Sequence, residues 1–194
     1  MNRTKVLTLI AVFALALGGL VGGTVAWLSD TTDTVTNTFT YGDISIGLTE
    51  TDTELDGDDD ATTNDYKMVP GSNITKDPIL TVNGGSEKCW LFVKLEKTEN
   101  FDDFLTFELA QGWESVKGVE GVYYRIVDAS AADQSFGVLV DNIVTVKSDV
   151  TKDMLNALDI DPENTTYPQL FVTGYAVQFA NIDTPEQAWS FVAP

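Results

Sequence analysis

The fold is decided by the stretch Cys89-Trp90-Leu91-Phe92-Val93-Lys94-Leu95. Its first, third, fifth and seventh residues are all apolar, which is the period-two pattern of a β-strand with one buried face. The opposite face begins with Trp90 and Phe92 and turns polar at Lys94. A strand with one wholly apolar face and one partly polar face is typical of an antiparallel sandwich. We therefore predict a central strand over residues 89–95.

Similar patterns surround this strand. Ile44, Ile46 and Leu48 alternate with polar or small residues and share one face of a strand over 44–49. The turn Asn83-Gly84-Gly85-Ser86 joins the central strand to an apolar run at 79–82. Further strands are predicted at residues 31–41, 122–127, 136–140, 143–147 and 169–179.

Helical signals are few. Thr151 caps a segment in which Met154, Leu155 and Leu158 have helical spacing. Thr184 and Pro185 stand at the N-cap and first position of a final helical turn. Residues 101–107 fit either a short helix or a packed loop. The chain is thus predicted to be mainly β, a jelly-roll-like antiparallel β-sandwich with one or two short helices.

The N-terminus has the three parts of an export signal. Arg3 and Lys5 precede an apolar run, and small residues lead to Ala26. We predict cleavage between Ala26 and Trp27, because about 20 continuous apolar residues are needed to span a membrane and this run is shorter and broken by glycines. An uncleaved anchor is the alternative, and it is the one membrane contact we expect. The predicted organisation is an export signal at 1–26, an N-terminal β segment at 27–49 and a single β-sandwich domain at 50–194 with an acidic loop at 50–66.

The charge of the chain restricts its partners. It has 11 Lys and Arg against 30 Asp and Glu, a net charge of −19, and loss of residues 1–26 would remove two of the cations. A field this negative repels phosphate backbones and anionic lipid, so no nucleic-acid partner is expected. Cations, basic surfaces or another copy of the chain, once salt screens the repulsion, are the partners that fit.

Catalytic chemistry has little support. The chain has no histidine, which removes His-based acid–base relays, Ser–His–Asp and Cys–His nucleophile systems and histidine zinc sites. The single cysteine, Cys89, lies in the apolar strand and is interpreted as a small buried hydrophobe. Paired carboxylates are expected by chance among 30 acids. We predict that the protein is not an enzyme and needs no cofactor.

The acidic loop is the one cluster with the character of a ligand site. Asp56, Asp58 and Asp60 stand at alternating positions, and hard oxygen donors suit calcium. The spacing is not that of an EF-hand, because Gly57 follows the first acid at once and Lys67 occupies the twelfth position. A solvated charge run is the favoured interpretation and a calcium site the alternative.

Trp27, Ser29 and Asp30, followed by Asn37-Thr38-Phe39 and Gly42, resemble the start of the mature chain in the TasA/camelysin family. Trp27, Ser29 and Asp30 match its aromatic-x-(Ser/Asn)-Asp opening, and Asn37-Thr38-Phe39 with Gly42 matches the Asn-Thr-Phe-x-x-Gly segment that follows. The resemblance implies export through a SipW-like signal peptidase, the expected partner during export. It also implies a jelly-roll secreted to the cell surface or biofilm matrix. Some camelysin members are described as metalloproteases, a role that a chain without histidine cannot fill with a zincin site.

Members similar to TasA assemble into matrix fibres, with a strand of one subunit completing the sheet of the next. The resemblance therefore implies self-association, or association with homologous matrix subunits, and makes residues 27–41 a donor strand. Val35, Phe39 and Tyr41 would fill acceptor pockets, since side chains at alternate positions face one way. Pairing of this segment within its own subunit is one alternative. A monomeric surface module that binds calcium, glycan or cell wall is another, and a secreted hydrolase a remote third.

Overall fold

The computed structural model describes residues 43–51, 66–158 and 166–194. All of them belong to one compact unit, Tyr41–Pro194. The strands of this described part form three antiparallel sheets. The first sheet has the order β1 (Ile46–Thr49), β3 (Ile79–Val82) and β8 (Gln134–Gly137). The second has the order β10 (Leu170–Gln178), β4 (Cys89–Lys97), β7 (Val122–Val127) and β6 (Glu114–Ser115). The third has the order β2 (Asn73–Thr75), β9 (Leu139–Val146) and β5 (Leu105–Leu109).

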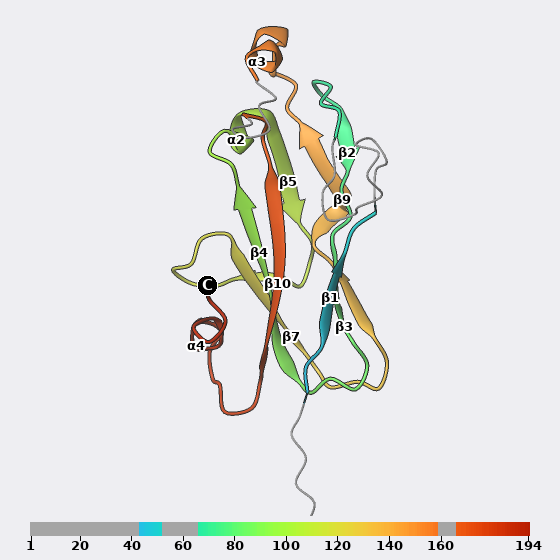
Figure 1. The fold of residues 1–194 in the computed structure, drawn as a ribbon, viewed down its shortest axis with the longest axis vertical. Helices are drawn as coiled ribbons and strands as arrows, with labels where there is room; N and C mark the ends of the chain where they lie inside the picture. The colour runs from blue at the N-terminus through green and yellow to red at the C-terminus, as the bar shows by residue number, and fades with distance from the viewer. Residues whose placement is uncertain (1–42, 52–65, 159–165) are drawn as a thin grey trace, which may run out of the picture. The chain divides into compact units, whose positions relative to one another are not determined.

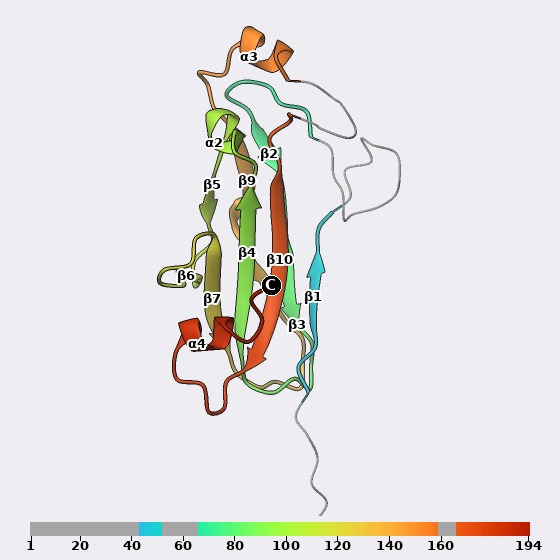
Figure 2. The same ribbon diagram turned by 60° about the vertical axis from the view of Figure 1, so that its left-hand side comes forward.

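The first and third sheets continue one another. β2 leads into β3 and β8 into β9 with only a few residues between them. Backbone hydrogen bonds cross these joints, from Val138 N–H to the Pro78 carbonyl at 3.1 Å and from Lys76 N–H to the Asn142 carbonyl at 2.8 Å. Together the two sheets make one layer, which faces the β10-β4-β7-β6 sheet (Figure 1, Figure 2).

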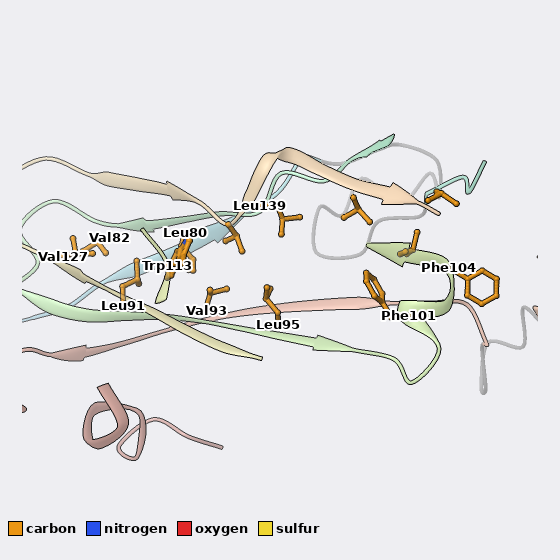
Figure 3. Close-up of a cluster of buried hydrophobic side chains, with 14 of the residues drawn as sticks. Leu80, Val82, Leu91, Val93, Leu95, Phe101, Phe104, Trp113, Val127 and Leu139 are labelled. Atoms are coloured by element: carbon orange, nitrogen blue, oxygen red, sulfur yellow. The ribbon is translucent and has the colours of Figure 1, made fainter. Parts of the chain in front are cut away.

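The main core lies between these layers (Figure 3). Leu80 from β3 and Val146 from β9 meet Leu91 and Val93 of β4, and all four are inaccessible to solvent. The predicted inner face of β4 and the mainly β, antiparallel class are confirmed, whereas the jelly-roll connectivity stays a prediction. Cys89 is buried as predicted, and burial raises the pKa of its thiol to about 11, so the thiol is protonated at neutral pH.

The outer face of β4 is also buried where its aromatic residues stand. Trp90 and Phe92 form a second apolar cluster with Trp189 of helix α4 (Pro185–Trp189). The ring centroids of Phe92 and Trp189 lie 5.5 Å apart, and Tyr175 meets Trp189 edge-on at 5.1 Å. The C-terminal segment therefore covers one half of this face, which local alternation gave no reason to expect.

Three short helices occur in the described part, whereas one or two were predicted. The predicted caps are present, since Thr151 Oγ1 accepts from Met154 N–H at the start of α3 (Lys152–Asn156) and Thr184 Oγ1 accepts from Gln187 N–H, each at 3.2 Å. The segment 101–107 divides into helix α2 (Phe101–Phe104) and the start of β5. No helix among residues 43–51, 66–158 and 166–194 is long and apolar enough to cross a membrane.

The predicted boundary between strands 136–140 and 143–147 was wrong. Asp141 and Asn142 have left-handed φ values of 53° and 57°, but they form a bulge inside β9 rather than a turn between two strands. Aspartate and asparagine tolerate this conformation, so the pair can bend the strand without reversing it. The short strands β2, β5 and β6 were not predicted either, because two to five residues are too few to establish a period.

Candidate interaction surface at the β10 edge

The residues singled out by sequence lie outside the described part. This holds for the cleavage pair Ala26 and Trp27, for the donor residues Val35, Phe39 and Tyr41, and for the acidic loop residues Asp56, Asp58 and Asp60. Within residues 43–51, 66–158 and 166–194, no three acidic or cysteine side chains gather closely enough to hold a metal ion. The structure instead describes the surface that a donor strand would need.

That surface is the free edge of β10. β10 pairs with β4 along its whole length, from Leu170 opposite Lys97 to Gln178 opposite Cys89. Hydrogen bonds from Thr98 N–H to the Gln169 carbonyl and from Phe179 N–H to the Lys88 carbonyl set the odd-numbered residues of β10 toward β4. The even-numbered residues from 170 to 178 therefore direct their N–H and C=O groups away from β4. None of these groups has a backbone partner among the described residues.

The composition of β10 does nothing to protect this edge. Its nine residues, Leu-Phe-Val-Thr-Gly-Tyr-Ala-Val-Gln, include no charge and no proline. Natural sheets usually blunt a long edge strand with lysine, proline, a bulge or a covering element. A nine-residue neutral strand in a chain of net charge −19 is a ready template for another strand.

β1 lies beside β10 in both views (Figure 1, Figure 2). We call the line between the two strands the β1–β10 seam. No backbone hydrogen bond joins the strands in the described part of the chain. Leu48 of β1 is paired with the fully buried Leu80 and so points to the core side, yet it is 41% exposed. Apolar surface is thus accessible at the seam, next to unpaired backbone.

One glycine lets the layers approach each other near this seam. A Cβ at Gly174 of β10 would lie 2.2 Å from Cδ2 of Leu80, which is far inside van der Waals contact. Leu80 therefore packs directly on the backbone of β10. This contact holds the inner face of β10 against the core. The edge of β10 that points away from β4 has no backbone partner among the described residues.

A polar network holds the two ends of the predicted acidic loop. Lys76 Nζ contacts both carboxylate oxygens of Glu50, at 2.8 and 2.9 Å, and the two side chains are each 13% exposed. Tyr66 donates its hydroxyl to Glu50 Oε1 at 2.5 Å. Burial and this hydrogen bond raise the pKa of Tyr66. Glu50 precedes residues 52–65 and Tyr66 follows them, so both ends of the loop meet at Lys76.

Asp77 completes this network and makes it sensitive to acid. Its carboxylate accepts from Thr51 N–H at 2.9 Å and from Thr51 Oγ1 at 2.7 Å. Burial raises the pKa of Asp77, but the two hydrogen bonds from Thr51, a hydrogen bond from its own backbone N–H and the charge of Lys76 together outweigh that effect and hold the pKa below its usual value of 3.8. The stability contributed by this group is therefore present above about pH 4 and is lost as the pH falls through the lower folded-state pKa.

Replacement of Asp77 by asparagine should remove this dependence. We expect D77N to lower the free energy of unfolding at pH 7 by up to about 1 kcal/mol, and to match the original chain more closely at pH 3. Urea unfolding at both pH values measures the change. D149N, at an exposed aspartate with the same change in charge, should show neither effect. An equal loss at pH 3 and pH 7 in D77N would contradict the assignment.

Comparison of the chain with protein-family models, with curated proteins and with solved structures gave no match. The described geometry by itself defines a mainly β, two-layered domain. Its edge strand β10 is uncharged, and one edge of that strand has no backbone partner among the described residues. Sequence inspection found β10 as a strand but missed its open edge. The signal was present, because residues 169–179 carry no charge in a strongly acidic chain.

Proposed function

We propose that this protein is a secreted structural subunit that assembles into, or associates with, extracellular matrix fibres by strand donation. The observation that carries the proposal is the outer edge of β10, a strand of nine neutral residues whose outward backbone groups have no backbone partner in the described part of the chain. The donor is the segment 27–41 of another copy, exported behind the signal at 1–26 and freed by cleavage after Ala26. A jelly-roll connectivity and a SipW-like peptidase belong to the same proposal, on the strength of the resemblance to the TasA/camelysin family.

Physical chemistry supports the pairing of these two segments. Residues 31–41 contain six threonines, one valine and two aromatic residues, and these residue types favour extended backbone. Main-chain hydrogen bonds would supply affinity at the β10 edge, and alternate side chains such as Val35, Phe39 and Tyr41 would supply specificity. Because every subunit is strongly acidic, assembly should strengthen as salt screens the repulsion.

Deletion of residues 27–41 tests the donor. We expect the chain that begins at Trp27 to form fibres visible by electron microscopy, and the chain that begins at Gly42 to stay monomeric with an unchanged far-ultraviolet spectrum. Fibres of undiminished yield from the truncated chain would refute strand donation. A chain from Trp27 that stays monomeric at every protein, salt and calcium concentration would favour the alternative of a surface binding module.

A substitution pair within the donor sharpens this test. F39D places a charge on the face predicted to enter the acceptor, and T38D places the same charge on the opposite face. We expect F39D to reduce fibre yield by at least about tenfold, because burial of an unpaired carboxylate is costly, and T38D to reduce it much less. Equal effects would show that charge alone, rather than side-chain insertion, controls assembly.

A further inference from the structure

Arg125 of β7 lies between two aromatic rings on the side of the domain away from the β1–β10 seam. Its guanidinium carbon is 3.9 Å from the ring centroid of Phe136 on β8 and 5.2 Å from that of Trp113, in the segment between β5 and β6. Trp113 is itself held, because its Nε1–H donates to the Gly137 carbonyl at 2.9 Å. The cation is thus fixed between residues of both layers by cation–π contacts.

The backbone also makes room for this side chain. A Cβ at Gly112 would lie 2.8 Å from one terminal nitrogen of Arg125. Gly112 has a φ of +88°, a conformation that favours glycine. The guanidinium group therefore occupies a cradle formed by Gly112, Trp113 and Phe136, which restricts its motion before any ligand arrives.

The guanidinium charge has no partner among the residues that the structure describes. Among the described residues, Arg125 has no ion pair and its guanidinium no hydrogen bond, whereas four lysines form ion pairs. The one fully buried side-chain polar atom without a partner in that part of the chain is Trp90 Nε1, so the guanidinium nitrogens remain accessible to solvent. Burial lowers the pKa of Arg125, and no neighbouring carboxylate offsets that effect.

A fixed guanidinium with free donors is suited to one kind of ligand. Its planar fork matches the two oxygens of a carboxylate, and restriction by aromatic rings reduces the entropy lost on binding. The chain itself supplies such groups in excess, with 30 Asp and Glu against 11 Lys and Arg. Each copy would otherwise repel the next, so a contact that pairs an acid with this unused cation favours association.

We propose that Arg125, held between Trp113 and Phe136, binds the carboxylate of an aspartate or glutamate from a second copy of this chain. The source of the carboxylate rests on the proposed function, since it requires self-association, but the site itself does not. It is separate from the β10 edge, because Arg125 lies on β7 and β10 pairs with β4 on the other side. Strand donation and carboxylate binding can therefore be tested independently.

The first experiment asks whether the site binds a carboxylate. The chain from Trp27 contains a single arginine, so the Nε–H resonance in a nitrogen-15 spectrum reports on Arg125 alone. We expect sodium acetate to shift this resonance saturably, and sodium chloride at equal ionic strength to shift it far less. F136L, which removes the nearer ring, should weaken acetate binding several-fold. An acetate shift that never saturates, or is matched by chloride, would overturn the site.

The second experiment asks whether a second copy supplies the carboxylate. We expect R125Q to weaken self-association, measured by sedimentation, by about tenfold, as expected for loss of a charge-assisted bidentate pair. K117Q removes one positive charge from an exposed lysine without an ion pair in the described part, and should weaken association much less. Thermal unfolding of both variants checks that they fold.

The outcomes separate the two proposals. If acetate binds saturably but R125Q and K117Q associate alike, the second copy is not the source, and the inference fails while the fibre function stands. If acetate binds but the chain never self-associates, the proposed function fails, and with it the assignment of the source. Saturable acetate binding together with selective loss of association in R125Q supports the inference in full.

Discussion

Replacement of Val172 by proline is expected to stop fibre growth while the subunit stays folded. Val172 is an even-numbered residue of β10, so its N–H points to the free edge rather than to β4. Proline removes that donor and places its ring where an added strand would lie, yet it removes no hydrogen bond to β4. We expect the rate of fibre elongation, measured by light scattering and electron microscopy, to fall by at least about tenfold.

Val172→Ala is the matched control for this substitution. Alanine removes more of the half-buried side chain than proline does, but it keeps the N–H. Its effect on stability is thus expected to resemble or exceed that of proline, while fibres still form. If V172P forms fibres at the normal rate and has a far-ultraviolet spectrum like that of the original chain, the part of β10 around Val172 is not the acceptor.

Substitution of Gly174 by alanine is expected to produce the largest loss of stability on this strand. The new methyl group would overlap Leu80, which is completely buried and cannot move without displacing its neighbours. Such overpacking typically costs about 1–3 kcal/mol. Gly174 has no left-handed φ among the described backbone angles, so the cost arises from packing rather than from backbone strain.

A double substitution isolates this contact. L80A alone should cost about 2–5 kcal/mol, because it leaves a cavity in the core. In L80A/G174A the methyl group at 174 occupies part of that cavity, so the loss should be at least about 1 kcal/mol smaller than the sum of the single losses. Urea unfolding of the four proteins measures the coupling. Additive losses would show that Leu80 does not rest on the backbone of β10.

Much of the fold could be predicted where a residue's role depends on its near neighbours. The alternation in β4 identified its buried face, because side chains two apart on a strand share one side. Thr151 and Thr184 identified two helix starts, because a cap bonds a backbone N–H only three residues away. The predicted boundary between strands 136–140 and 143–147 was wrong, because Asp141 and Asn142, which are residues typical of turns, form a bulge within β9.

The candidate surfaces could not be predicted in the same way. Sequence assigned function to segments at 27–41 and 50–66, whereas the described part of the structure offered the β10 edge and the cradle of Arg125. Both features depend on residues far apart along the chain, such as Gly174 with Leu80 and Arg125 with Phe136. Local periodicity contains no information on which strands become neighbours.

Local sequence therefore determined that this chain is mainly β, that β4 and β10 are strands, that Cys89 is buried and that the chain is strongly acidic. Tertiary structure alone decided that β10 is an edge, that α4 packs on Phe92 and that Arg125 has no ion pair among the residues that the structure describes. The physical reason is that a strand's period reports which face is buried. Strand pairing over long sequence separations decides which backbone groups and which charges are left without a partner.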